Sequence, residues 1–397
     1  HFPHHEWPAA RDKKLSPVHE KVVKAGGVMG AYNGWERANW FAGQGDDVSE
    51  EASHTWDRQG PWALRIREEA ENVRDNCGVL DLPGFSRFTL SGKGSSQYLL
   101  GLITGGLPKI GRMNLAYFAD TRGRILTEMS VIRHEHDRFT LITAASAQWH
   151  DFDILNNGLP EFLTLKDNTN EISTLIVTGP KSRDVLNAIG TDADLSLGWL
   201  SHQSAVLADQ PCTLIRVSFA GELGWEVHAE NAKIPILYDA IISTGAKPFG
   251  MYALNSLRIE KGYRAWKGDL STDYSLFEGG LGRFVKLDKV ENFPGKAALQ
   301  SEMQQGSKKF FATLIVEAGA SDAPYMSTIW YDGKIVGETT SGAFGYRVGK
   351  SIALCVLRSD VAAAGTEVEV EIFGQRCRAT VQLDQPLWDA NNDRLRA

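Results

Sequence analysis

The chain has 397 residues, 43% of them hydrophobic and 23% charged, and its formal net charge is −7. This length provides for two or three domains with a sizeable core. The negative charge excludes a general attraction to nucleic acid or to an anionic membrane, and no apolar run approaches the roughly 20 residues that cross a bilayer. We therefore expect neither nucleic acid nor a membrane as a partner.

The first 60 residues are rich in Trp, His, Gly and charged side chains and show little periodicity. We expect an irregular N-terminal arm, residues 1–60, whose tryptophans anchor it to the rest of the protein. The opening HFPHHEWPAARDKK has no apolar stretch typical of a signal peptide, and we expect it to be an internal part of a longer chain or a trimmed form of one.

Residues 61–305 show helix and strand patterns in alternation. Apolar residues recur at helical spacing over 62–77, and Gly78 is placed to end that helix. Residues 78–92 predict short strands around a Pro-Gly turn. Two further strands that meet at the turn 134–137 predict a β-hairpin or meander.

A similar succession recurs further along the chain. Residues 173–190 predict a strand followed by a helix that begins at Pro180 and ends at Gly190. Residues 213–229 predict two strands joined by a glycine-containing turn, and 231–245 predict a helix with one apolar face. That face consists of Ile234, Leu237, Tyr238 and Ile241. This order indicates an α+β fold with mixed sheets, because the elements do not follow a strict βαβ alternation.

The last part of the chain, residues 306–397, consists of short alternating strands with glycine turns. This pattern predicts a separate small β-barrel or sandwich. We therefore divide the chain into an arm, a central region of residues 61–305 and a C-terminal β domain.

Two nucleotide-binding motifs can be excluded. GYRVGKS, residues 345–351, approaches a P-loop, but its required first glycine is Phe344 and a strand pattern follows where a P-loop needs a helix. No GxGxxG follows an early strand, so the chain has no flavin- or nicotinamide-binding fingerprint of its own.

Metal and covalent chemistry also lack support. The clustered histidines have no Cys, Asp or Glu partners at ligand spacing, so we expect solvated histidines and no metal. They are His1, His4, His5, His134 and His136. Ser182 falls in the first turn of a helix, where serine is commonly a cap. The cysteines lack CxxC spacing, which favours buried free thiols in a reducing compartment, the cytoplasm or an organelle matrix. They are Cys77, Cys212, Cys355 and Cys377.

Glu128 lies at the centre of a predicted strand, where carboxylates are depleted. Leu126, Ser130 and Ile132 share its face, and the opposite face is also apolar. We therefore expect burial on both sides, a perturbed pKa and a specific partner, which makes Glu128 a candidate functional residue. A solvated strand face is the alternative.

Glu226 repeats this pattern in GELGWEVHA. Trp225 lies on the apolar face of the predicted strand, and Glu226 and His228 lie on the other face. Gly221 and Gly224 allow the backbone to approach a ligand closely. A solvent-facing strand glutamate remains open as the alternative.

The chain resembles the glycine-cleavage T-protein (aminomethyltransferase) family in VTGPKSRDVL, SFAGELGWEVHA, NSLRIEKGYRAWKGDL with EGGLGRFVKLDK, and TTSGAFGYRVGKSIAL. Its first 41 residues resemble the segment that joins the flavin domain to the folate domain in dimethylglycine and sarcosine dehydrogenases. The resemblance implies three lobes in a ring around a tetrahydrofolate channel, two of them in residues 61–305 and the third a C-terminal β-barrel.

The resemblance also implies roles for individual residues. Glu128 corresponds to the family's strand aspartate near the reactive nitrogens of tetrahydrofolate and is the catalytic candidate. Glu226 corresponds to the glutamate that holds the pterin ring, whose row of N–H donors matches two carboxylate oxygens. Trp266 is expected as a stacking wall, and Arg264 and Tyr117 as further cofactor-binding residues.

Three positions depart from the family pattern. Leu254 replaces an arginine at the start of a helix, and Leu115 replaces a tyrosine for which Tyr117 is a substitute two residues on. Glu128 is one methylene longer than the aspartate it replaces. These changes bear on how folate is seated and on which one-carbon donor is accepted.

The implied activity is the capture, as 5,10-methylene-tetrahydrofolate, of the iminium or formaldehyde unit released by demethylation of an N-methyl amine of the dimethylglycine or sarcosine type. FAD would then belong to a separate domain or subunit, and the location would be cytoplasmic, or the mitochondrial matrix in a eukaryote. Two alternatives remain: a self-contained demethylase that acts on an S-, O- or N-methyl donor and forms 5-methyl-tetrahydrofolate, and a non-catalytic folate-binding module.

Overall fold

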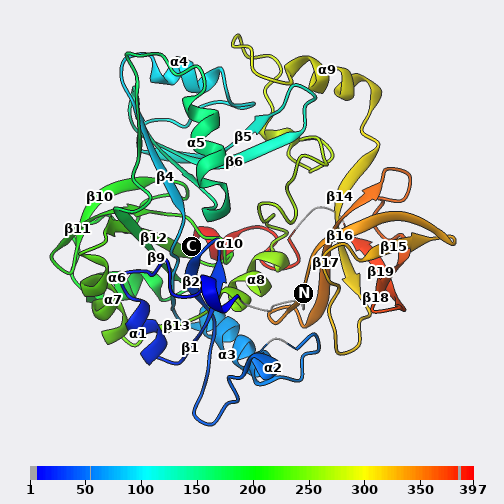
Figure 1. Ribbon diagram of the computed structural model, residues 1–397, viewed down its shortest axis with the longest axis horizontal. Helices are drawn as coiled ribbons and strands as arrows, with labels where there is room; N and C mark the ends of the chain where they lie inside the picture. The colour runs from blue at the N-terminus through cyan, green and yellow to red at the C-terminus, as the bar shows by residue number, and fades with distance from the viewer. Residues whose placement is uncertain (1–6, 54, 383–385) are drawn as a thin grey trace.

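The computed structural model describes residues 7–53, 55–382 and 386–397. The chain forms three lobes, two built on separate sheets and one on a closed barrel. Figure 1 shows the five-stranded sheet at the top, the six-stranded sheet at the lower left and the barrel at the right, with α8 between the last two. The predicted α+β fold with three lobes is confirmed.

The first lobe contains an antiparallel sheet of order β5-β6-β7-β4-β8. Its strands are β4 (Ser86–Ser91), β5 (Arg112–Ala119), β6 (Ile125–Glu135), β7 (Arg138–Thr143) and β8 (Thr164–Asp167). Helices α4 (Ser95–Leu100) and α5 (Gln148–Asn156) accompany it, with a short 3-10 turn, η2 (Ala145–Ala147), before α5. Strand β6 is the predicted strand of Glu128, and it extends two residues into the predicted turn.

The second lobe contains a mixed sheet of order β10-β11-β12-β9-β3-β13, in which only the short β13 runs parallel to its neighbour. Its strands are β3 (Gly78–Asp81), β9 (Ile172–Thr178), β10 (His202–Leu207), β11 (Gln210–Ile215), β12 (Gly224–Glu230) and β13 (Lys247–Pro248). Its helices are α3 (Pro61–Asp75), α6 (Ser182–Ala188), α7 (Ile234–Ser243) and α8 (Met251–Glu260).

The predicted apolar face of α7 is confirmed, because all four of its residues are buried in the core of this lobe. The helix expected from Pro180 begins two residues later, at Ser182. Gly190 follows its end with a φ of 80°, a left-handed conformation that glycine adopts at little cost.

The third lobe is the predicted barrel, closed in the order β14-β17-β16-β15-β18-β19. Its strands are β14 (Lys309–Val316), β15 (Thr328–Tyr331), β16 (Lys334–Gly345), β17 (Lys350–Arg358), β18 (Glu367–Ile372) and β19 (Gln375–Gln382). A segment with η3 (Gly282–Phe284) and α9 (Lys296–Gln305) leads into it, and α10 (Asp393–Arg396) ends the chain. Strand β17 begins at Lys350, inside GYRVGKS, where a P-loop would need a helix.

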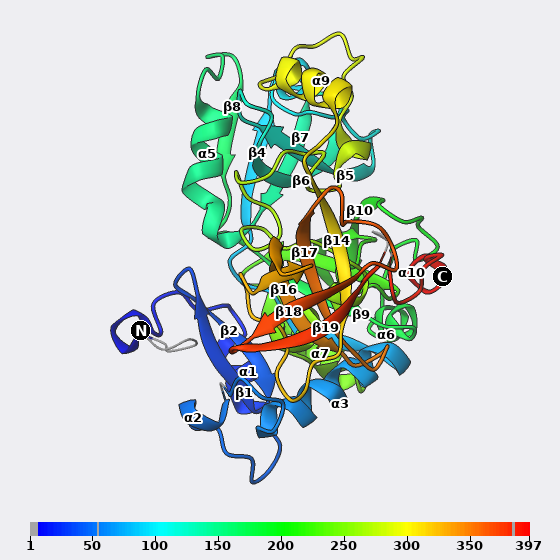
Figure 2. The same cartoon turned by 90° about the vertical axis from the view of Figure 1, so that its right-hand side faces the viewer.

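The N-terminal arm is more regular than expected. It contains η1 (Pro8–Ala10), α1 (His19–Lys24), a two-stranded sheet of β1 (Gly27–Tyr32) and β2 (Trp35–Phe41), and α2 (Glu50–Ser53). The strands meet at Asn33–Gly34, both with positive φ, which is a strong hairpin signal that the search for periodicity missed. Trp40 is fully buried, as an anchor would be, but Trp7 and Trp56 are exposed. Figure 2 shows this hairpin beside α3.

Buried charges join the lobes near the centre. Arg347 of the barrel region donates to Glu222 at 2.8 Å and also to Glu260 at the end of α8. The Trp388 indole and the Arg394 guanidinium donate to Glu222 at 2.8 and 2.7 Å, so the C-terminal segment closes over the same carboxylate. Ion pairs of this kind are costly to break singly, because removal of one partner leaves a buried charge.

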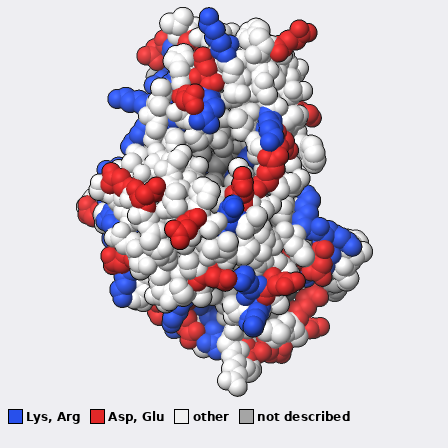
Figure 3. Space-filling view, turned by 90° about the vertical axis from the view of Figure 1, so that its left-hand side faces the viewer, with Lys and Arg blue, Asp and Glu red and all other residues white. Residues whose placement is uncertain are grey.

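Within the described ranges, no helix is long and apolar enough to span a bilayer. On the face shown in Figure 3, acidic and basic side chains are intermingled and no extended basic surface stands out.

Candidate functional site

Glu128 and Tyr117 are directly opposite each other on neighbouring strands, β6 and β5. Register partners on antiparallel strands lie on one face of the sheet, which brings their side chains together. The Tyr117 hydroxyl donates a hydrogen bond to the Glu128 carboxylate. The ring of Phe284 packs against that of Tyr117, with 4.9 Å between ring centres.

The surroundings perturb both ionisable groups. Burial raises the pKa of Glu128, and the hydrogen bond from Tyr117 and the charge of Arg264 partly oppose this rise. Burial and the neighbouring Glu128 hold the pKa of Tyr117 well above its ordinary value, so the phenol keeps its proton and remains a donor. The expected perturbed pKa and specific partner of Glu128 are thus both present.

The expected burial of β6 on both faces is confirmed only in part for the face of Glu128, where Ile132 is buried but its neighbours are not fully covered. Ile125 and Met129 on the opposite face are completely buried, whereas Leu126, Glu128 and Ser130 are only partly covered. This face is covered in part by Phe284, which packs against Tyr117. Phe284 belongs to a largely irregular segment, and not to a sheet or a long helix. Glu128 is therefore desolvated and still reachable.

Arg264 and Trp266 belong to the loop that follows α8. Arg264 donates to the Gly279 carbonyl at 3.0 Å, and its guanidinium lies 3.8 Å from the centre of the Phe311 ring. Trp266 packs in the same apolar cluster as Tyr117. Its buried Nε1 has no hydrogen-bond partner in the described part of the chain. The structure thus brings Tyr117, Glu128 and Arg264 together and places Trp266 in the adjoining cluster.

Asp269, which the sequence analysis missed, holds this loop in place. Its carboxylate is fully buried and accepts hydrogen bonds from Arg258 at 2.7 Å, the Ala265 backbone N–H at 2.7 Å and the Thr340 hydroxyl at 2.5 Å. The only sequence sign of this role is that Asp269 follows Gly268 in a turn, and such a pair is common in surface loops.

Glu226 lies on β12 in the second lobe, with its side chain 24% exposed. Trp225 and Val227 fill the opposite, buried face, as predicted from alternation. The Nε2 atom of His228 lies 2.9 Å from the Glu226 carboxylate. Glu226 is therefore partly exposed but held by a buried neighbour, which differs from the freely solvated strand glutamate of the alternative reading.

The two glutamates lie on sheet faces that meet at the junction of the first two lobes. A small apolar cluster joins the sheets there and consists of Met113, Ile132, Ile142 and Ile215. Ile132 is on the Glu128 face of β6, and Ile215 is the register partner of Glu226. Because Ile132 and Ile215 pack together, the faces that carry the two carboxylates are turned toward one another.

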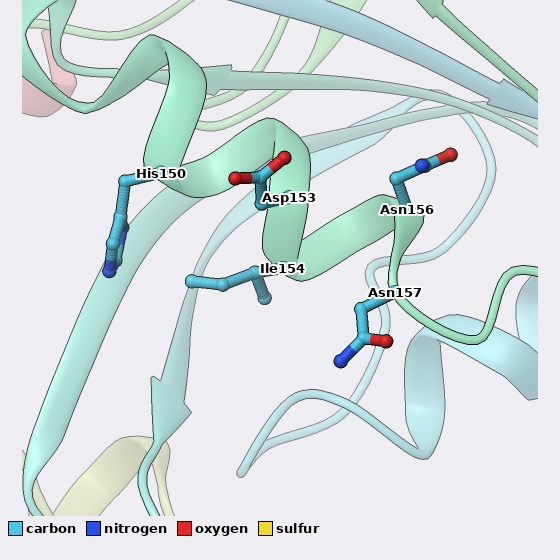
Figure 4. A pocket seen from close by; sticks show the side chains of 5 residues that line it. All are labelled: His150, Asp153, Ile154, Asn156 and Asn157. Atoms are coloured by element: carbon cyan, nitrogen blue, oxygen red, sulfur yellow. The ribbon is translucent and has the colours of Figure 1, made fainter.

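A pocket beside α5 and the histidines of the predicted cluster are further candidates. The pocket in Figure 4, about 520 Å³, is lined from one side by α5 and the residue after it, and its side chains point in different directions. His134 packs against His202 of the second lobe and forms a hydrogen bond with the Thr140 hydroxyl. His1, His4 and His5 lie outside the described residues. Nowhere in the described ranges do three His, Cys, Asp or Glu side chains gather as in a metal site.

The cysteines are free thiols, as expected. Cys77, Cys212 and Cys355 are buried, but Cys377, near the turn of the hairpin formed by the last two barrel strands, is only partly covered.

The fold and site define an α+β protein with two facing sheets, a carboxylate on each, and a closed barrel. Residues 18–289 match the family model of the GCVT N-terminal domain, and residues 309–389 match that of the glycine cleavage T-protein C-terminal barrel domain. The chain therefore belongs to the glycine-cleavage T-protein family, a family of aminomethyltransferase-type enzymes, as the sequence blocks predicted.

Individual relatives agree with this assignment. The chain is 35% identical to mitochondrial dimethylglycine dehydrogenase of Mus musculus over 92% of its own length but only 43% of the relative. It is 28% identical to the aminomethyltransferase of Shouchella clausii, over 92% of this chain and 95% of that one. The crystal structure of aminomethyltransferase T from Bartonella henselae has the same fold, with a TM-score of 0.83 and 21% identity over 95% and 98% of the two chains.

Proposed function

We propose that this chain binds tetrahydrofolate at the junction of its first two lobes and transfers to it a one-carbon unit from an N-methyl amine of the dimethylglycine or sarcosine type. The observation that carries the proposal is the pair of carboxylates on facing sheets, one of them desolvated and bonded to a phenol. Bound tetrahydrofolate would supply the two nitrogens that accept the carbon.

The residues present fit such a ligand. Glu226 offers carboxylate oxygens for a row of pterin N–H donors, and its side chain is partly exposed. The orphaned Nε1 of Trp266 and the apolar cluster around it provide an aromatic wall with one donor. Arg264 adds a positive charge next to Glu128.

Glu128 performs the proton chemistry in this proposal. Its raised pKa brings the carboxyl group closer to neutral pH, where a general acid or base is most effective. Tyr117 holds one carboxylate oxygen by donating to it, which leaves the other oxygen for the reacting groups. When ionised, Glu128 also stabilises positive charge that develops on the one-carbon donor.

The test measures tetrahydrofolate binding and product together. We expect the protein to bind tetrahydrofolate and to form 5,10-methylene-tetrahydrofolate from formaldehyde faster than the uncatalysed reaction, with Glu128→Gln losing this gain. No folate binding, or no rate above the uncatalysed background, contradicts the proposal.

Two rivals have specific support. The near-complete match to an aminomethyltransferase of about this length favours a self-contained enzyme, which as a demethylase would give 5-methyl-tetrahydrofolate from an S-, O- or N-methyl donor. The burial of Leu254, where the family pattern has an arginine, favours a folate-binding module without turnover. The product, or its absence despite binding, distinguishes the three.

The partner and the location follow from the same proposal. The chain spans less than half of the dimethylglycine dehydrogenase it matches, so we propose that a flavin-dependent dehydrogenase domain or subunit supplies the one-carbon unit. We propose a cytoplasmic location, or the mitochondrial matrix in a eukaryotic cell.

A further inference from the structure

His228 connects Glu226 to the neighbouring lobe. Its Nε2 lies 2.9 Å from the Glu226 carboxylate, and its Nδ1 lies 3.3 Å from Nε of Arg87 and 3.2 Å from the Thr174 hydroxyl. The imidazole is 8% exposed and Arg87 is 3% exposed, so water contributes little to either. All polar atoms of the imidazole are thus engaged by protein groups.

Arg87 determines which nitrogen of His228 carries the proton. A guanidinium donates hydrogen bonds and cannot accept them, so the Nδ1 that faces it must be the acceptor. The remaining proton of a neutral imidazole then lies on Nε2 and points at Glu226. Burial lowers the pKa of His228; the hydrogen bond with Glu226 opposes this fall, and the charge of Arg87 adds to it. Because the pKa lies below its ordinary value, the ring is neutral near pH 7.

Arg87 itself comes from the sheet of Glu128. It is the register partner of Ile142, and Ile142 is the register partner of Ser130, which shares the face of Glu128. Arg87 and Glu128 therefore project from one face of the first sheet. Arg87 is fixed further by donating to the Ile172 carbonyl at 2.8 Å and the Phe85 carbonyl at 3.2 Å.

We propose that His228 is a positioning residue for the ligand-binding glutamate: its Nε2–H holds one oxygen of Glu226, so that the other is presented in a fixed direction to the pterin. Arg87 fixes the tautomer and, because it reaches across the junction, sets Glu226 relative to the lobe that carries Glu128. This inference rests on the proposed function. A carboxylate oriented before binding loses less conformational freedom when it binds, which favours affinity.

Two substitutions separate the two ends of the imidazole. His228→Asn places an amide oxygen near the position of Nδ1 and removes the donor to Glu226. His228→Gln places an amide N–H near the position of Nε2 and keeps that donor. We expect His228→Asn to weaken tetrahydrofolate binding roughly tenfold or more, and His228→Gln to stay within a factor of about three of the native protein.

Matched controls separate positioning from packing. Glu230→Gln changes an exposed residue on the same face of β12 and is expected to leave affinity unchanged. In a Glu226→Ala background, which has no side-chain acceptor for Nε2–H, the effect of His228→Asn should nearly vanish, because the residue acts through Glu226. Equal losses in both backgrounds, or equal losses for the Asn and Gln variants, indicate a packing role and overturn the inference.

Nitrogen-15 NMR of labelled histidine in the ligand-free protein provides a readout that does not depend on folate or on the stability of a variant. We expect a neutral His228 protonated on Nε2; protonation on Nδ1 overturns the inference even if the proposed function holds. If the native protein does not bind tetrahydrofolate, the proposed function fails and this inference fails with it. If folate binds natively and His228→Asn binds equally well, only the inference fails.

Discussion

The two glutamates at the lobe junction occupy similar positions on their strands but different surroundings. Glu128 is paired with a phenol from the adjacent strand of its own sheet, and burial raises its pKa. Glu226 is paired with an imidazole two residues along its own strand, which is held by an arginine from the other lobe. In the proposed function, the first environment adjusts the pKa of a proton-transferring group, and the second orients a hydrogen-bond acceptor. One residue type thus serves two purposes, decided by what surrounds it.

The largest expected effect comes from Glu128. Glu128→Gln keeps an acceptor for Tyr117 but removes the ionisable group, so we expect one-carbon transfer to fall by about 10²–10⁴-fold. Tetrahydrofolate affinity and the thermal midpoint should change little. Steady-state kinetics, calorimetric titration and thermal unfolding measure the three quantities. Full turnover of the Glu128→Gln variant would show that Glu128 does not carry out the proton chemistry and that this role is assigned to the wrong glutamate.

Glu226→Ala should produce the opposite pattern. Loss of a charged acceptor should weaken tetrahydrofolate binding by roughly 10–100-fold. Because the substitution leaves Glu128 and Tyr117 in place, kcat at saturating folate should remain within a few-fold of native. A variant in which kcat falls and affinity does not would reverse the roles of the two residues.

Tyr117→Phe should have a smaller effect and a defined sign. The hydrogen bond from Tyr117 lowers the pKa of Glu128, so its loss should raise that pKa further. Any step that needs ionised Glu128 then requires a higher pH, so the rising limb of the pH–rate profile should shift to higher pH. Glu226→Gln should leave that limb in place; a shift there instead would show that the limb does not report on Glu128.

The smallest expected effect is on the pH dependence of stability, and it comes from Asp81, a carboxyl group away from both glutamates. Burial raises the pKa of Asp81 to about 7, although the Ser16 hydroxyl donates to it at 2.5 Å. Since this folded-state pKa exceeds the unfolded value, the contribution to stability is complete below about pH 4 and is lost as the pH rises through 7. The free energy of unfolding should fall by up to about 1.4 kcal/mol per pH unit across that interval.

Asp81→Asn should remove this part of the pH dependence in denaturant titrations, whereas Asp332→Asn on an exposed turn should not. An unchanged slope in Asp81→Asn would show that other groups govern the pH dependence of stability. The Asp81 titration also serves the comparison of the two glutamates. It shows how much of any loss of activity with pH comes from unfolding and how much from the protonation of Glu128.

Much of the site could be predicted because strand alternation is a local property. The period of two residues put Glu128 and Glu226 on definite faces, and the period of the helix identified the buried face of α7 before any contact was known. Even the pairing of Glu226 with His228 was implicit in their shared face. The hairpin at Asn33–Gly34 could also have been predicted, because Asn-Gly is a turn signal, but such a pair does not show up as periodicity.

What only the tertiary structure decided depends on contacts between distant parts of the chain. The partner of Glu128 is Tyr117 because of the register between two strands, and a shift of one residue would have turned the tyrosine to the other face. Arg87 reaches His228 across 141 residues of sequence, and the partial cover over Glu128 depends on how an irregular segment lies upon the sheet. The sequence by itself determined which faces carry the two acids, since alternation needs no distant neighbour. Their partners and their burial came from the packing of the lobes, because these depend on what the rest of the chain places beside them.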